Sequence, residues 1–310
     1  MLWRVHGEFF ADHMPMVAGS VAFFAMLAIF PGLIGVVSLY GLLADPADVA
    51  RQLHELSAAL PDAARALLAA QLNEIVKSSS STLGVGLAMS LSITVLTASG
   101  GVHALITGIN MAYDEKETRS YLRLRWLALK FTAGIMLFVV VAIATIAVLP
   151  HLLDEFGLGR ATQRAVTLGR WPALGAAVAT GLSVLYRHAP NRTPPRWRWV
   201  SWGAVLATLM WTLASLVFSA YSTNFGRFNR TYGALGGVIV LLLWIYFSVL
   251  AILIGAELNA ELEHQTSVDS TVGPAKPMGE RNAYVADTLG ALPPEEAPRW
   301  LQRLRRIKRG

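Results

Sequence analysis

The sequence predicts an all-α, polytopic membrane protein with six transmembrane helices. Two observations lead to this prediction. Of its 310 residues, 54% are hydrophobic and 15% are charged, whereas soluble domains carry about 25% charged residues. Long uncharged runs also recur along the chain, and most of them reach the roughly 20 residues that a helix needs to cross a bilayer.

Six uncharged runs mark the predicted spans, which are residues 14–44, 78–113, 131–153, 171–186, 199–226 and 231–256. The fourth run is short, and Arg170 and Arg187 at its two ends are expected to extend their charged groups to the interfaces. After residue 265 the composition changes to Ser, Thr, Pro, Gly and charge, which is typical of a flexible segment. We therefore expect a transmembrane domain over residues 1–265 and a flexible basic cytoplasmic tail over residues 266–310.

Loop charges orient the predicted spans. The loop between the second and third spans and the loop between the fourth and fifth each carry four basic residues. Loops rich in Lys and Arg stay in the cytoplasm. Because six spans place both termini on that same side, we expect the N- and C-termini to be cytoplasmic.

Several segments outside the spans are predicted to lie at the membrane surface. Leucines recur at helical spacing on either side of Pro61 in the 45–77 loop, which predicts two amphipathic helices at the outer surface. Apolar residues near the start of the chain predict a short interfacial helix. The basic loop 190–198 and the last twelve residues, which hold six basic residues, are expected to contact anionic lipid headgroups at the cytoplasmic face.

Three segments together resemble the YihY/virulence factor BrkB family of bacterial inner-membrane proteins. They are SVAFFAMLAIFPGLIGVVSLYGLL (20–43), GINMAYDEKETRSYLRLR (108–125) and NRTYGALGGVIVLLLWIYFSVLAILIGAELNAEL (229–262). The resemblance implies a six-span protein of the bacterial inner membrane with a role in envelope integrity, serum resistance or lipid export. Some members carry an older label as ribonuclease BN, which implies RNA hydrolysis as a remote alternative.

The residues themselves do not indicate an enzyme. The chain has no cysteine, and its seven histidines are scattered without the spacing of a metal-ligand motif. Metal-dependent RNA hydrolysis needs clustered ligands around an activated water. We therefore expect no catalytic residues, no metal, no cofactor and no nucleic-acid partner. A phosphate-binding Gly-Lys-Ser/Thr loop is also missing from the sequence, so ATP is not expected to be the direct energy source.

Polar side chains form a stripe on each of two predicted spans. On the second span and on the fifth, the stripe residues fall within an arc of roughly 80° at 100° per residue. Such stripes turn away from lipid, either to pack helices together through hydroxyl groups or to line one shared polar crevice. The crevice hypothesis names Ser99, His103, Thr107, Asn110, Asp114, Thr212, Ser215 and Ser219.

Ionisable groups at membrane depth are functional candidates. His103 is either a proton relay or a neutral imidazole bonded to a neighbouring hydroxyl. Glu257 is expected to pair with Arg119, Arg123 or Arg125 of the adjacent cytoplasmic loop. That pair is either a structural contact at the interface or a gate that opens when the pair breaks.

The remaining candidates belong to the segments that carry the resemblance. Gly233 and Gly237 have the spacing that permits close helix contact, and Pro31 is expected to kink the first span, as a hinge or as a packing bend. The candidate motif and gate residues are Pro31, Arg119, Tyr232, Gly233, Gly236, Gly237, Glu257 and Asn259.

The sequence thus favours an inner-membrane protein that transports or organises an envelope lipid or another amphiphile. The alternative is a scaffold or envelope factor that transports nothing. A cavity open to one leaflet favours the first, and a tightly packed bundle favours the second.

Overall fold

The computed structural model describes residues 2–43, 80–143, 145, 160–224 and 234–290. Within them the regular secondary structure is helical, and the only β-type pairing is an isolated bridge between Pro195 and Thr271. The elements are α1 (Leu2–Ala11), α2 (Met14–Leu43), α5 (Ser80–Ala112), α6 (Tyr121–Ile143), α8 (Arg160–His188), α9 (Trp197–Asn224), α11 (Ala234–His264) and α12 (Tyr284–Asp287). The all-α prediction is confirmed for this part of the chain.

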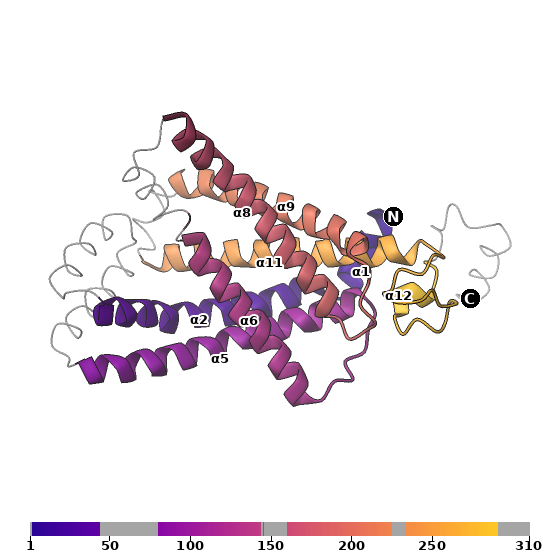
Figure 1. The fold of residues 1–310 in the computed structure, drawn as a ribbon, viewed down its shortest axis with the longest axis horizontal. Helices are drawn as coiled ribbons and strands as arrows, with labels where there is room; N and C mark the ends of the chain where they lie inside the picture. Colours follow the sequence, from indigo (N-terminus) through magenta and orange to yellow (C-terminus); the bar gives the residue numbers. More distant parts are fainter. Residues whose placement is uncertain (1, 44–79, 144, 146–159, 225–233, 291–310) are drawn as a thin grey trace.

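The long helices form a bundle with α11 in its middle. Figure 1 shows α2, α5 and α11 running along the long axis, with α6 and α8 crossing them obliquely. The closest pairings are α2 with α5 and α9 with α11, and α11 also packs on α1, α2, α5 and α12. Helix α6 packs on α5, and α8 packs on α9.

The prediction of six spans is confirmed only in part. Among the described residues, four helices are long and apolar enough to cross a membrane, at 88–112, 121–142, 197–219 and 237–264, and the bent pair α1–α2 makes up to five. Helix α8 is not among them, although it spans 29 residues. Its uncharged stretch between Arg170 and Arg187 contains Pro172 and several Gly, Ala and Thr residues, which lowers its hydropathy.

A sharp bend separates α1 from α2 at the start of the first membrane segment. Helices α1 and α2 meet at an angle of 60°, at a break where His13 has a φ of 52°. Helix α2 continues through Pro31. The helix after Pro31 stays close to α5, since a Cβ on Gly32 would contact the Thr94 methyl group at 3.5 Å.

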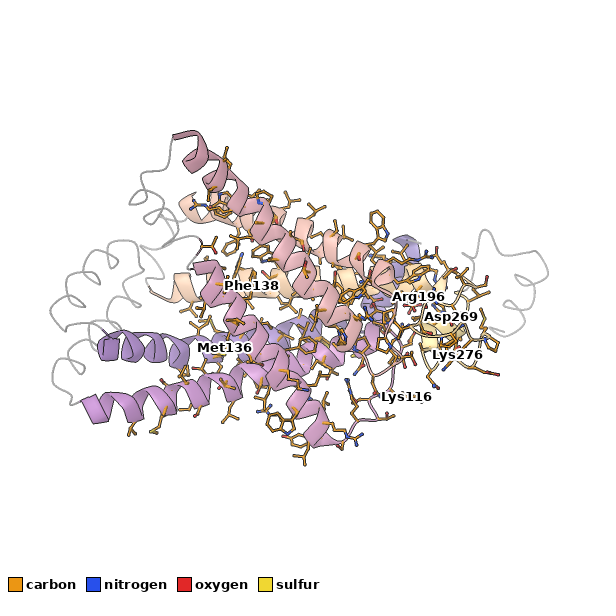
Figure 2. All side chains as sticks on the ribbon, in the orientation of Figure 1. Lys116, Met136, Phe138, Arg196, Asp269 and Lys276 are labelled. Atoms are coloured by element: carbon orange, nitrogen blue, oxygen red, sulfur yellow. The ribbon has the colours of Figure 1, made fainter. Side chains whose placement is uncertain are left out.

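One end of the bundle gathers α1, α12, the loops 113–120 and 189–196, and the segment 265–290; we call it the loop end. Figure 2 shows Lys116, Arg196, Asp269 and Lys276 together at this end. Main-chain hydrogen bonds join the 189–196 loop to the segment 265–290, such as Arg196 N–H to the Ser270 carbonyl at 2.8 Å. Side-chain bonds join the 113–120 loop to both, such as Asn191 Nδ2 to the Lys116 carbonyl at 2.8 Å and Tyr284 N–H to Glu115 at 2.8 Å. The loops that the charge count assigned to one side of the membrane therefore do lie together.

The hydrophobic core also lies toward the loop end. Its fully buried members come from α2, α5, α6, α8, α9, α11 and α12 and from the residues just after α5 and α8, and the largest are Met14, Ile106, Ile109, Tyr113, Tyr186 and Leu253. Farther along the bundle, large apolar side chains of α5, α6 and α9 are exposed. In a membrane protein that surface is expected to face lipid tails.

Residues 266–290 are packed, which differs from the flexible tail expected there. Asp269 accepts hydrogen bonds from Thr271 N–H at 2.9 Å, from the Thr271 hydroxyl at 2.7 Å and from Lys276 N–H at 2.8 Å. Arg281 is 4% exposed and donates to the carbonyls of Ala286 at 2.6 Å and Ser267 at 2.9 Å. A polar sequence can therefore order itself here because its charged groups satisfy loop carbonyls and N–H groups.

Some predictions fall on residues outside the described part of the chain. They concern the two amphipathic helices of the 45–77 loop, Tyr232 and Gly233 in the last-span motif, and the basic C-terminal twelve residues. The short helix predicted at the start of the chain is confirmed as α1.

Candidate functional site

A pocket of about 380 Å³ lies between α2, α5 and α6. Its apolar side is formed by Val17 and Phe24 of α2 with Gly100 and Ala104 of α5. Glycine at position 100 keeps this wall close, because a Cβ there would lie 3.0 Å from the Phe24 ring. The α2 wall thus approaches the α5 backbone directly.

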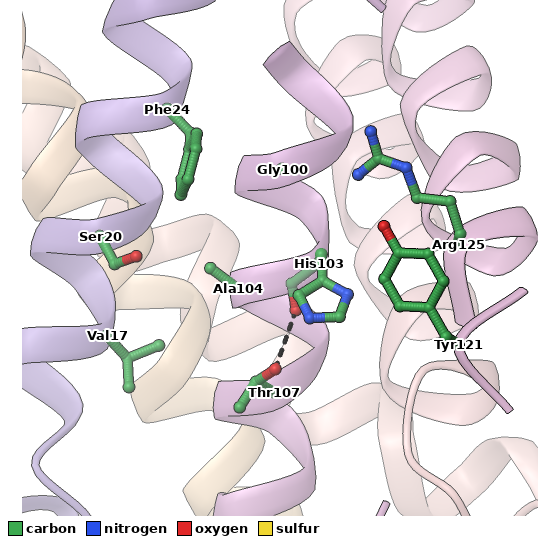
Figure 3. A pocket seen from close by; sticks show the side chains of 9 residues that line it. All are labelled: Val17, Ser20, Phe24, Gly100, His103, Ala104, Thr107, Tyr121 and Arg125. Atoms are coloured by element: carbon green, nitrogen blue, oxygen red, sulfur yellow. Dashed lines mark hydrogen bonds between the residues drawn. The ribbon is translucent and has the colours of Figure 1, made fainter. Parts of the chain in front are cut away.

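The opposite side of the pocket is polar. Figure 3 shows Tyr121 and Arg125 reaching from α6 toward His103 on α5, with Thr107 one turn away. Ser20 of α2 completes the lining. The Thr107 hydroxyl donates to the His103 carbonyl at 3.1 Å.

The charge of the pocket lining is positive. Arg125 contributes a permanent cation, and no carboxylate is among the lining residues. Its guanidinium donates to the Leu96 carbonyl through a long hydrogen bond of 3.3 Å. With five N–H donors on a guanidinium, Arg125 can also bind an anionic group in the pocket. The arrangement suits a molecule with an apolar part and an anionic or polar head.

The two polar stripes do not line this pocket together. His103 and Thr107 of the α5 stripe do line it, whereas Thr212, Ser215 and Ser219 of α9 do not. Helix α5 packs mainly on α2 and α6, while α9 packs on α11 and α8. The shared-crevice hypothesis is therefore not supported in the described part of the chain.

Most stripe hydroxyls are satisfied locally. Ser99 donates to the Leu96 carbonyl at 2.8 Å, and Thr212 donates to the Thr208 carbonyl at 2.8 Å. Bonds of this kind within one helix remove the need for a polar neighbour. Ser215 instead accepts a hydrogen bond from Trp244 Nε1 of α11 at 3.1 Å, so at this position the stripe serves helix packing. Ser219 is exposed.

Asn110, at the end of the α5 stripe, joins two loops. Its Nδ2 donates to Glu117 at 2.9 Å, and its Oδ1 accepts from Asn191 N–H at 2.8 Å. Arg119 binds Glu117 through Nε at 2.8 Å and also donates to the Ala189 carbonyl at 2.9 Å. Burial opposes ionisation of Glu117, but the bonds from Arg119 and Asn110 outweigh it and lower its pKa. Asp114 is exposed, with a left-handed φ of 53°.

The expected ion pair of Glu257 with Arg119, Arg123 or Arg125 is not formed among the described residues. Arg119 is bound to Glu117, and Glu257 is 1% exposed. Its Oε1 has no hydrogen-bond partner among the described residues. The prediction was wrong because a carboxylate two residues away from Arg119 reaches it without leaving the loop.

The other carboxylates of α11 have distant partners that the sequence did not indicate. Glu261 binds Arg4 of α1, with Nε to Oε2 at 2.7 Å and Nη2 to Oε1 at 2.9 Å. Glu263 binds Arg192 of the 189–196 loop and also accepts from the Ser270 hydroxyl. The sequence did contain one indication of such partners. Three acids lie in the last turns of an apolar helix, and each of them needs a cation or a proton when it is buried.

Close helix contact occurs at glycines other than those predicted. Gly203 of α9 and Gly255 of α11 meet backbone to backbone, and Asn259 accepts the Gly203 N–H at 2.7 Å. Asn259 also donates to the Val200 carbonyl at 3.2 Å, so this motif residue holds α9 to α11. Gly236 and Gly237 lie in the first turn of α11.

Comparison with known proteins places these features in a family. Residues 5–279 match the profile of the family described as Virulence factor BrkB. That match extends into the packed segment beyond α11.

Three relatives illustrate the similarity. YfkH of Bacillus subtilis, named a ribonuclease-like protein, is 30% identical over 257 residues, which cover 79% of this chain and 88% of the relative. A UPF0761 membrane protein of Tolumonas auensis is 28% identical over 81% of each chain. Another, of Idiomarina loihiensis, is 28% identical over 62% of this chain and 65% of its own length. No solved structure matches the chain.

Proposed function

We propose that this chain, which belongs to the Virulence factor BrkB family of membrane proteins, binds and moves or organises an amphiphile of the bacterial envelope. The pocket between α2, α5 and α6 carries the proposal. It combines an apolar wall around Phe24 with a polar wall that contains Arg125. An anionic headgroup would bind the guanidinium, and an acyl chain would lie along α2.

The size and place of the pocket support a part of a lipid as its ligand. A volume of about 380 Å³ is within the range of small-molecule sites and holds a headgroup with the first part of a chain. Tyr121 is 72% exposed, so the remainder of a chain can leave the pocket toward the surrounding lipid. Arginine suits this role because its planar donors match phosphate oxygens.

The test is lipid binding by the full-length protein purified with native lipids. Native mass spectrometry compares the wild type with Arg125→Gln and with the matched control Arg123→Gln, which changes an exposed arginine of the same helix. A charge-assisted hydrogen bond contributes about 1.5–3 kcal/mol. Arg125→Gln should therefore weaken binding of anionic phospholipid about tenfold or more, and Arg123→Gln should not. Equal binding by both variants would contradict the proposal.

A scaffold without transport is the second candidate, and the α9–α11 contact favours it. There the helices meet at glycines with no space between them, which is the packing of a rigid bundle. The two candidates separate in vesicles that contain a fluorescent anionic lipid. If the protein is a transporter, it should speed movement of the lipid between leaflets. If it is a scaffold, it should bind the lipid without moving it.

The proposed setting is the bacterial inner membrane with the loop end in the cytoplasm. The basic loops at that end support this orientation. Reporter fusions after Lys77 and after Gly310 should report opposite sides of the membrane. We also propose a role without catalysis, which an RNA-cleavage assay on the purified protein tests directly, given the name of the Bacillus subtilis relative.

A further inference from the structure

The carboxyl group of Glu257 at the loop end is buried, and no described residue forms an ion pair with it. It is 1% exposed, and its Oε1 has no hydrogen-bond partner in the described residues. The Tyr113 hydroxyl is also buried without a partner there. Glu261, one turn later on the same helix, is bound at two points by Arg4. The two acids therefore lie in opposite electrostatic situations within one turn.

Negative groups dominate the surroundings of Glu257. The groups that act on it electrostatically are Asp12, Glu8, Glu261 and Asp114. These groups have titratable and charged neighbours of their own at the loop end. From the N-terminal side they are Arg4 and Glu8 of α1, with Asp12 and His13 at the α1–α2 break. From the remaining elements they are Tyr113 and Asp114 after α5, Tyr186 of α8, Arg192 of the 189–196 loop, Glu261, Glu263 and His264 of α11, and Tyr284 and Asp287 of α12.

The remaining helices packed on α11 are α2, α5 and α9. The one titratable residue of α5, His103, lines the α2–α5–α6 pocket, and α2 and α9 bring no charge to Glu257. Helix α2 contains no Asp, Glu, Lys, Arg or His, and Arg198, the one charged residue of α9, is exposed. The cation that α1 contributes here, Arg4, is already bound to Glu261. An ionised Glu257 would thus add a fourth negative charge next to Asp12, Glu8 and Asp114 with no cation to offset it.

Burying an unpaired carboxylate is strongly unfavourable. The packed arrangement therefore accommodates Glu257 as an uncharged carboxylic acid. When Glu257 releases its proton, the charge can be relieved by water that enters between α11 and α1. Helix α1 is suited to yield, because it is ten residues long and is joined to α2 by the 60° break.

We propose that Glu257 is a proton-binding site whose protonation holds α1 against α11 and whose deprotonation releases it. The proton leaves the carboxyl group for water at the loop end, and its return restores the packed state. Such a site would give the bundle a means of responding to proton concentration on that side of the membrane. The inference does not depend on the ligand of the α2–α5–α6 pocket.

The test measures access to the α1–α11 interface as a function of pH. The chain has no cysteine, so single cysteines give no background. Val5 of α1 is 8% exposed, and Val5→Cys keeps the side chain close to its native size. Gln265→Cys is an exposed reference just beyond α11. The ratio of the two labelling rates in vesicles removes the effect of pH on the thiol itself.

With Glu257 present, the ratio should rise with pH, by up to about tenfold per pH unit for a one-proton equilibrium. Glu257→Gln removes the proton site and should give a flat ratio. Glu280→Gln, which changes an exposed carboxylate, is the matched control and should leave the rise in place.

Two results overturn the proposal. One is a flat ratio in the protein with native Glu257, whatever the variants show. The other is an unchanged rise in Glu257→Gln. If that variant does not fold, Glu257→Met replaces it, because an apolar side chain of similar length also removes the proton site and suits the buried position. Glu257→Asp retains a carboxyl group and must retain the rise.

Discussion

Gly203 of α9 and Gly255 of α11 meet so closely that neither position has room for a side chain. A Cβ on Gly203 would overlap the Gly255 carbonyl oxygen, and a Cβ on Gly255 would lie 2.6 Å from the Gly203 carbonyl oxygen. The Tyr186 hydroxyl, which donates to the Ile252 carbonyl at 2.7 Å, closes the same contact. The α9–α11 pair is therefore built on backbone approach rather than on interlocking large side chains.

Gly203→Ala should strongly destabilise the protein. Overpacking usually costs about 1–3 kcal/mol, and here the obstacle is backbone, so we expect about 3 kcal/mol or more. The measurement is the melting temperature of the purified protein. Gly175→Ala on α8, where a Cβ meets nothing within 4 Å, is the control and should melt like the wild type. Similar melting of both variants would show that α9 and α11 can move apart at little cost.

Arg4→Gln should also destabilise the protein, because it leaves the buried Glu261 carboxylate without its cation. Removing one partner of a buried pair costs about 3–5 kcal/mol; we expect the lower end of that range, since the side chain of Arg4 is 11% exposed. The double variant Arg4→Gln/Glu261→Gln should recover part of the loss. If the double variant is as unstable as the sum of the single ones, the ion pair does not couple α1 to α11.

The segment 267–287 should lose its order in acid. Burial opposes ionisation of Asp269, but hydrogen bonds from Lys276 and Thr271 outweigh it and lower its pKa below the ordinary value of 3.8. A lowered pKa in the folded state stabilises the segment above the ordinary value, and this stabilisation is lost as pH falls through the folded-state pKa.

Hydrogen exchange of residues 267–287 measures this order. The wild type should show protected amides at neutral pH and lose that protection as pH falls below 3.8, the ordinary pKa of Asp269, and through its lowered folded-state pKa. Asp269→Asn should show weak protection at every pH, while Glu280→Gln should behave as the wild type. Full protection of Asp269→Asn would mean that the carboxylate charge is not needed for the fold of this segment.

Cysteine labelling should distinguish the two ends of the α5 stripe. Thr107→Cys faces the pocket and is exposed, so a membrane-impermeant thiol reagent added at the loop end should react with it. Ser99→Cys is 0% exposed and should stay unreacted, as should the control Ile106→Cys, also 0% exposed. Equal reaction at positions 99 and 107 would restore a continuous crevice along α5.

The sequence alone was enough to predict the helices and the grouping of their connecting loops. An uncharged run in a bilayer must satisfy its own backbone hydrogen bonds, so it forms a helix. The loop between the second and third predicted spans and the loop between the fourth and fifth each carry four basic residues, which predicts that both loops lie on one side of the membrane. In the structure the two loops lie together at the loop end. The match to residues 5–279 agrees with the resemblance read from three segments.

The tertiary structure decided which residues meet. Arg4 and Glu261 are 257 positions apart, and no local pattern pairs them. A helical stripe shows which face of α5 or α9 is polar but not which helix covers that face. Hydroxyl groups that bond to carbonyls of their own helix need no partner on a neighbouring helix, so they do not indicate one. The pocket needed Phe24, His103 and Arg125 from three helices. The sequence already made Glu257 a candidate, but only the packing showed that it is buried without a cation among the described residues, because burial and partners are properties of the folded arrangement rather than of the sequence pattern.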